Sequence, residues 1–194
     1  MDYKIILGVI ATAIALAGYV PYFINIFAGK TKPHAFSWLV WATLMGIGFA
    51  AQVAGHGGPG AWATGSGALM CFIIFILALV KGSREFTPFD WICLALALCA
   101  MIAWGITGRA LSAAILITLA DAIGFLPTFK KGFYKPYEET VSMYALSAIK
   151  FIPALFALES RTLTTVLYPA SLIAMNGIFS TYIIIRRRQC ALKS

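Results

Sequence analysis

Seven long runs of apolar residues follow one another along the chain, and short polar segments separate them. The runs cover about 3–28, 36–54, 61–80, 89–107, 111–129, 140–158 and 163–185. The separating segments contain glycine, proline or charged residues, as in the sequence GKTKP at 29–33. A helix needs roughly 20 mainly apolar residues to cross the hydrocarbon core of a bilayer. The pattern therefore predicts an all-α integral membrane protein with seven transmembrane helices.

The composition agrees with this prediction and excludes most soluble alternatives. Of the 194 residues, 61% are hydrophobic and 11% are charged, whereas a soluble domain has about half apolar and about a quarter charged residues. Seven spans use about 140 residues, which leaves no room for a soluble domain of ordinary size. Basic loops on one side of a membrane explain the formal net charge of +8, so we expect a lipid bilayer and no nucleic acid as partner.

Lysine and arginine are distributed unequally between the two sides that the loops would occupy. One side holds Lys30, Lys32, Lys81, Arg84, Lys130, Lys131, Lys135, Arg186, Arg187, Arg188 and Lys193. The other side holds Lys4, Arg109 and Arg161, and Lys150 lies within a span. Because cytoplasmic loops are enriched in these residues, the bias predicts an N-terminus outside and a C-terminus in the cytoplasm.

Short sequence landmarks recur at an offset of 105 to 106 residues, which indicates an internal repeat. The sequence GYVP at 18–21 is matched by GFLP at 124–127, and ALMC at 68–71 by IAMN at 173–176. Two three-helix units separated by one helix have the same orientation, because a single span restores the direction of the chain. The predicted organisation is a first repeat over 1–82, a linker with the fourth helix over 83–109, a second repeat over 110–188 and a cytoplasmic tail over 189–194.

This 3+1+3 arrangement resembles the PQ-loop/SWEET (MtN3-like) transporter superfamily. Pro21 and Pro127 match the proline of the family's Pro-Gln pair, near the cytoplasmic end of the first helix of each unit, and a basic loop follows both. Tyr22 and Thr128 stand where the family has glutamine. The resemblance implies a small-molecule transporter that works by alternating access, with two similar bundles moving about a site near the bilayer midplane.

The resemblance also implies residues of a substrate pocket. Asn176 resembles the asparagine that sugar-transporting members place in the pocket, and Cys71 is its counterpart in the first unit. Prolines within helices permit kinks, so Pro21, Pro127 and Pro153 are candidate hinges. Pro153 lies deeper in its span than the family's proline, and the second span has none.

Two charged side chains, Asp121 and Lys150, lie deep inside predicted spans. Each is nine to ten residues from the loop between the fifth and sixth spans, which at 1.5 Å per residue places both roughly 14–15 Å into the membrane. A charge there costs about 2.5–3.5 kcal/mol on insertion scales, so each needs a partner or a wet cavity. Two readings stay open: a fixed ion pair that locks the helices, or side chains that bind a charged substrate or exchange a proton.

Other side chains add weaker signals. Trp41 and Tyr144 lie about one turn inside their spans, where they either stack on a bound ring or pack in the core. Trp38 and Tyr168 lie near span ends, where an interfacial aromatic belt is the ordinary explanation. His34 stands alone in a predicted loop, where a solvated side chain is expected.

The sequence thus predicts a SWEET-like small-molecule transporter, either a facilitator or coupled to protons, without a cofactor or metal. The candidate substrate-binding residues are Asp121, Lys150, Asn176, Trp41, Tyr144 and Cys71. A membrane-embedded ligand- or cargo-binding receptor on the same fold is the alternative. A retinal receptor with Lys150 as the Schiff base is disfavoured because Lys150 lies in the sixth span rather than the last. An enzyme is disfavoured because no nucleophile–base pair stands out, and the oligomeric state is left open.

Overall fold

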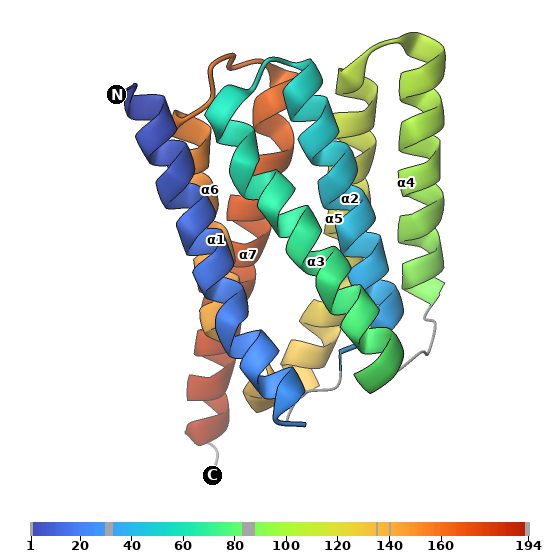
Figure 1. The fold of residues 1–194 in the computed structure, drawn as a ribbon. Helices are drawn as coiled ribbons and strands as arrows, with labels where there is room; N and C mark the ends of the chain where they lie inside the picture. The colour runs from blue at the N-terminus through green and yellow to red at the C-terminus, as the bar shows by residue number, and fades with distance from the viewer. Residues whose placement is uncertain (1, 30–32, 83–87, 135, 140, 193–194) are drawn as a thin grey trace.

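The computed structural model describes residues 2–29, 33–82, 88–134, 136–139 and 141–192, which form a bundle of helices (Figure 1). The α-helices are α1 (Tyr3–Phe27), α2 (Ala35–Ala54), α3 (Trp62–Lys81), α4 (Pro88–Thr107), α5 (Ala110–Tyr134), α6 (Val141–Phe156) and α7 (Leu163–Ala191). Two short 3-10 helices, η1 (Gly58–Ala61) and η2 (Pro136–Glu138), lie in the connections before α3 and α6. The predicted all-helical fold class is confirmed.

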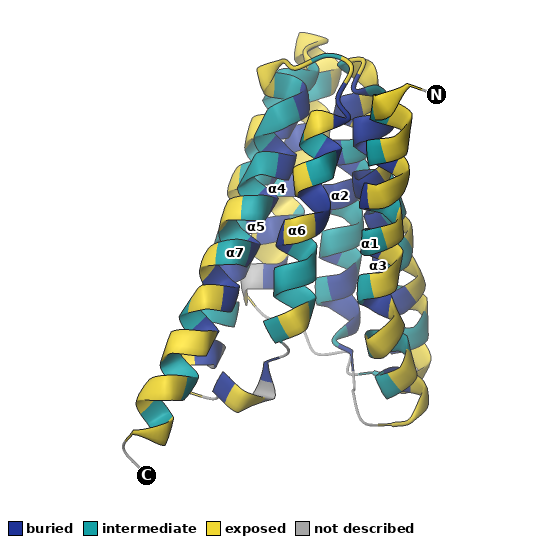
Figure 2. Ribbon diagram, turned by 90° about the vertical axis from the view of Figure 1, so that its left-hand side faces the viewer, coloured by how far each residue is buried: buried dark blue, intermediate teal, exposed yellow. Residues whose placement is uncertain are grey.

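Most of these helices have the properties of membrane spans. Six are long and apolar enough to cross a bilayer, and α6, with 16 residues, is apolar but shorter. Figure 2 shows exposed residues mainly on the outer faces of the bundle, and many of these are large and apolar, as are Ile5, Val9 and Ile24 of α1. Water-exposed surface of this kind would be unfavourable, whereas lipid chains match it. The chain therefore has the features of a multi-pass membrane protein.

The helices alternate in direction, so that the two termini lie at opposite ends of the bundle (Figure 1). The helices α1, α3, α5 and α7 run from the N-terminal end towards the end that carries the C-terminus. We call the latter the basic end, because Lys81, Lys130 and 186–188 lie there. The other end, with Lys4 and Arg109, is called the opposite end. Which side of the membrane each end faces stays a prediction.

Two helices are longer than the apolar runs that predict them. The predicted boundaries were 129 for the fifth span and 185 for the seventh, whereas α5 continues to Tyr134 and α7 to Ala191. The predicted tail at 189–194 therefore begins inside a helix. Lysine and arginine end an apolar run but are good helix formers, so the backbone hydrogen bonding continues past the membrane boundary.

The packing order of the helices positions the interior. In the first group α3 lies between α1 and α2 and packs on both, while α1 and α2 hardly touch. In the last group α7 lies between α5 and α6 in the same way. The two groups meet where α1 packs on α6 and where α2 packs on α5. The remaining helix, α4, packs on α5 and α2 at the edge of the bundle (Figure 1).

The opposite end of the bundle is tied together by contacts between the two groups. The backbone N–H of Glu159, after α6, donates to the carbonyl oxygen of Gly57, after α2, at 3.2 Å. The amide of Gln52, only 1% exposed, donates through Nε2 to the carbonyl oxygen of Thr165 at 3.1 Å. These hydrogen bonds close the bundle at the end where α2 and α6 finish.

Close packing of α2 on α7 predicts an effect of one added methyl group. A Cβ atom at Gly48 would lie 2.5 Å from Cδ1 of Tyr168, a ring that is 1% exposed, whereas a Cβ at Gly46 would meet no atom within 4 Å. We expect Gly48→Ala to lower the free energy of unfolding by about 1–3 kcal/mol through overpacking. Gly46→Ala is the matched control and should not destabilise, because alanine is the better helix former. Thermal unfolding in detergent measures both, and equal stability of the two variants would contradict the close α2–α7 approach.

Candidate functional site

A cavity of about 70 Å³ lies inside the bundle and is lined by every long helix except α4. One water molecule needs about 10–15 Å³, so the cavity has room for several waters or a small solute. Its walls include all six residues predicted to bind substrate: Asp121, Lys150, Asn176, Trp41, Tyr144 and Cys71. The structure brings these residues together from five helices, and their role in binding stays a prediction.

Asp121 lies at the middle of α5 and is 3% exposed. Its Oδ2 atom is buried and has no hydrogen-bond partner among the described residues. Buried polar atoms are nearly always paired, and an isolated buried carboxylate is costly. Oδ2 of Asp121 is therefore available to accept a hydrogen bond from a solvent or solute molecule in the cavity.

Lys150 reaches the same cavity from α6 and is also 3% exposed. Its Nζ atom lies 4.9 Å from the ring centroid of Phe151 and 5.4 Å from that of Tyr19, distances typical of cation–π contacts. Within the described parts of the chain, Nζ makes no hydrogen bond and lies within 4.0 Å of no carboxylate oxygen. A direct Asp121–Lys150 ion pair, one of the two readings left open by the sequence, is therefore not formed in this structure.

The remaining polar groups of the cavity are only partly used. Asn176 is buried in α7 and donates through Nδ2 to the carbonyl oxygen of Leu172, one turn earlier, at 2.8 Å. Its amide oxygen has no hydrogen bond to a described residue, which leaves an acceptor beside the cavity. Cys71 is buried in α3, with Sγ 3.5 Å from the hydroxyl oxygen of Tyr19. The hydroxyl of Tyr168 is buried without a partner among the described residues.

Aromatic rings form the wall of the cavity towards the basic end. Trp41 packs edge-on against Trp38, with ring centroids 5.2 Å apart. Tyr144 packs edge-on against Phe179 at 4.5 Å, and its hydroxyl donates to Oε2 of Glu139 at 3.1 Å. Trp41 and Tyr144 therefore pack in the core and also line the cavity. Core packing and stacking on a bound ring, the two alternatives from the sequence, are compatible at these positions.

Two aromatic residues lie elsewhere than the sequence predicted. Trp38 and Tyr168 were expected in an interfacial belt, but they are 3% and 1% exposed and line the cavity. Distance from the end of a span measures depth in the membrane and not the side of the helix that faces the bundle. Tyr19 also lines the cavity, and the sequence does not predict it as a pocket residue. The available signal is its place in the repeated GYVP landmark, whose second copy contributes Phe125 to the same cavity.

The predicted hinge prolines lie within helices. Pro21 lies within α1 and Pro153 within α6, and both helices continue past them. Pro127 falls within the bounds of α5, but its side chain lies outside the described part of the chain. A further intrahelical proline, Pro169, is buried in α7 next to Tyr168. Movement at these prolines stays a prediction.

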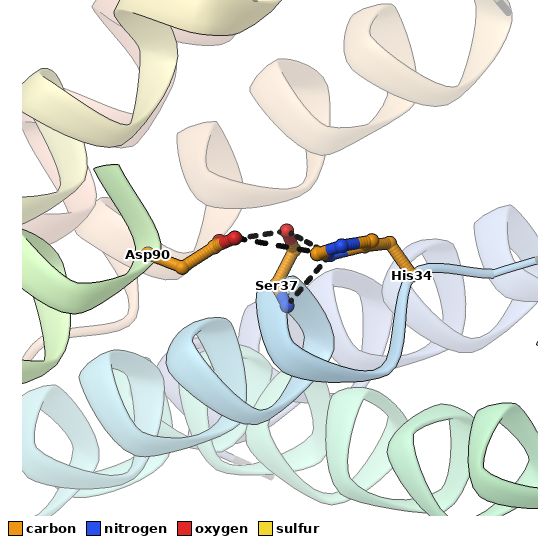
Figure 3. A network of polar contacts seen from close by, with 3 residues as sticks. All are labelled: His34, Ser37 and Asp90. Carbon is orange, nitrogen blue, oxygen red and sulfur yellow. Dashed lines mark hydrogen bonds and ion pairs between the residues drawn. The ribbon is translucent and has the colours of Figure 1, made fainter. Parts of the chain in front are cut away.

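A polar cluster outside the cavity joins the starts of α2 and α4 (Figure 3). His34 was expected to be solvated, but its Nδ1 lies 2.9 Å from Oγ of Ser37 and 3.9 Å from Oδ2 of Asp90. The Ser37 hydroxyl donates to Oδ1 of Asp90 at 2.9 Å. A serine nucleophile site uses one imidazole nitrogen for the serine and the other for the aspartate, whereas here Nδ1 faces both. The backbone N–H of Ser37 also donates to Nδ1 of His34 at 3.4 Å, so the cluster caps α2 and tethers it to α4.

The separate environments of the two buried charges predict an unusual stability pattern. We expect Asp121→Asn and Lys150→Gln each to leave stability unchanged or to raise it, because each removes a buried charge without an ion-pair partner. If the two formed a buried ion pair, each single change would cost about 3–5 kcal/mol and the double variant would recover most of that loss. Thermal unfolding of the wild type, both single variants and the double variant distinguishes these outcomes.

The matched control for this cycle is Asp2→Asn. Asp2 is an exposed carboxylate that caps α1 by accepting the backbone N–H of Lys4 at 3.1 Å. Asparagine caps a helix as well as aspartate does, so this control removes a negative charge outside the cavity and leaves the cap in place.

Comparisons with protein families, curated proteins and solved structures find nothing that matches the chain. The resemblance to the PQ-loop/SWEET superfamily therefore stays a prediction from the sequence. The function must be inferred from the cavity itself, with its two buried and separate charges inside a bundle of apolar helices.

Proposed function

We propose that this chain is a SWEET-like small-molecule transporter that works by alternating access about the central cavity. The observation that carries the proposal is the cavity itself, in which Asp121 and Lys150 face a space of about 70 Å³ without bonding to each other. Charged residues inside membrane spans are costly and commonly mark pathways for substrates or ions. A structural pair would need direct contact, which the two side chains do not make.

The packing order supports two repeated units within the proposal. If α1, α2 and α3 are exchanged with α5, α6 and α7 in that order, the same pairs of these six helices are in contact. In each group the third helix lies between the first two. The α1–α6 interface then maps onto the α5–α2 interface. Two similar units that meet along two equivalent interfaces can rock about a site between them.

The cavity wall supports the same repeat. Positions separated by 105 or 106 residues line it in five pairs: Tyr19 and Phe125, Trp38 and Met143, Trp41 and Ser147, Met45 and Lys150, and Cys71 and Asn176. Equivalent positions meet at one place only when that place lies near the axis that relates the units. The paired positions therefore support a substrate site in this cavity, because alternating access requires the substrate near that axis.

Alternating access requires contacts at both ends that form and break. At the opposite end, the Glu159–Gly57 and Gln52–Thr165 hydrogen bonds close the bundle. At the basic end, Arg187 of α7 donates through Nη2 to the carbonyl oxygen of Glu139 at 2.6 Å, a contact within the second unit that holds the loop before α6. The Glu139 carboxylate in turn accepts the hydroxyl of the cavity residue Tyr144, so the loop is coupled to the wall. In the proposal the basic end is cytoplasmic, and Pro21, Pro127 and Pro153 are the hinges.

The test is solute flux through purified protein in proteoliposomes. A thermal-shift screen of sugars, amino acids and vitamins at two pH values selects the solute, and its uptake is then measured with and without a proton gradient. We expect Asp121→Asn to abolish uptake while folded protein is recovered in full, because the change removes a cavity charge on which no described residue depends. Asp2→Asn should transport as the wild type does.

Two results would contradict this proposal. Binding of a solute without flux would indicate the ligand- or cargo-binding receptor instead. Loss of folded Asp121→Asn protein in proportion to the loss of uptake would assign the carboxylate a structural role.

A further inference from the structure

The cavity carries one negative and one positive side chain, and no other charged side chain is among the described residues that line it. Asp121 comes from α5 and Lys150 from α6, two helices that hardly touch each other. Each group is 3% exposed, and neither forms an ion pair with a described residue. The site therefore has a formal charge close to zero but contains two separate, unused centres of opposite charge.

This arrangement limits the charge of a solute that fits the site. A cation could pair with Asp121 but would leave the buried ammonium of Lys150 unpaired, and an anion would leave the carboxylate unpaired. A neutral polyol would leave both charges without a counter-ion. Leaving a buried charge unpaired is strongly unfavourable, so a solute with both charges satisfies the site best.

We infer that the solute of this cavity is a small zwitterion, whose ammonium binds Asp121 and whose carboxylate binds Lys150. The inference rests on the proposed transport function and names the chemical class of its substrate. The two charges of the solute complete two ion pairs at once, and together they carry no net charge across the membrane. An α-amino acid or another small amine-carboxylate has this form.

Other groups of the cavity suit the same solute. The unpaired hydroxyl of Tyr168 and the free amide oxygen of Asn176 offer hydrogen-bond partners to an ammonium group, which carries several N–H donors. Trp41 and Phe125 offer an apolar wall to the remainder of the molecule. The cavity volume of about 70 Å³ favours a solute with a small carbon skeleton.

The test compares one carbon skeleton in four charge forms on the full-length protein in lipid nanodiscs. For the leucine skeleton these are leucine, leucinamide, 4-methylpentanoate and 4-methylpentanamide, which are zwitterion, cation, anion and neutral. The corresponding glycine and phenylalanine series vary the size independently of the charge. Isothermal titration measures the affinities. We expect a zwitterion to bind about 30-fold or more tightly than its own single-charge analogues, as expected when one buried ion pair is lost.

Two variants separate the two ends of the solute. Asp121→Asn should lower the affinity for the zwitterion and remove its advantage over the anion, whose own affinity should not fall. Lys150→Gln should do the same with respect to the cation. A purely structural role would lower all affinities together. Asp2→Asn and Lys130→Gln, which change exposed charges outside the cavity, are the matched controls and should bind as the wild type does.

Three outcomes would overturn the inference: equal affinity for a zwitterion and its single-charge or neutral analogues, absence of binding by all three zwitterions to folded wild-type protein, or binding of a sugar in preference to them. The wild-type series decides even if a variant fails to fold. Failure of transport is distinguishable, because a zwitterion that binds but does not equilibrate across proteoliposomes contradicts the transporter and leaves the binding site in place. Flux of a neutral solute alone would support the transporter and contradict the zwitterion site.

Discussion

The burial of two opposite charges inside an apolar bundle is the constraint on which the rest of this structure depends. Asp121 and Lys150 lie where water is scarce and the cost of an isolated charge is high. Direct contact would relieve both, yet the structure places them on α5 and α6, with α7 between these helices. The cavity beside them is therefore the place where solvent or solute must satisfy these groups. Its aromatic walls, small volume and unpaired hydrogen-bonding atoms surround the place where these two charges must be satisfied.

The bundle topology explains why such a cavity exists. In each group of three helices the third lies between the first two, so the first and second helices stand apart and their inner faces are not covered by each other. When the two groups meet along α1–α6 and α2–α5, those faces enclose a space between them. Towards the opposite end, α2 and α7 pack closely where Gly48 meets the ring of Tyr168. The packing order therefore brings six helices around one interior region, and the side chains there leave the cavity unfilled.

Much of this fold could be predicted from the sequence, because apolar length and charge are directly encoded in it. The helical fold class is confirmed, and the six candidate residues line one cavity. For Asp121, Lys150 and Asn176 this follows from their depth, because a charge or amide deep in a span is unfavourable against lipid and turns to the interior. Other features depend on orientation about the helix axis, which depth does not specify. Trp38 and Tyr168 therefore turn inward against expectation, and Asp121 and Lys150 lie close in depth without pairing. The cluster of His34, Ser37 and Asp90 depends on a contact between α2 and α4 that no local sequence pattern predicts.

The central claim is that the two ends of the bundle open in turn about this cavity, and a distance measurement tests it most directly. Spin labels at His56 and Arg161, exposed positions beside the hydrogen bonds that close the opposite end, report the separation of the two loops by pulsed electron resonance. In lipid, with and without a solute that binds, we expect two populations, one short as in this structure and one longer. The solute should change their ratio. A single short distance under all conditions, with the solute bound at saturation, would contradict alternating access.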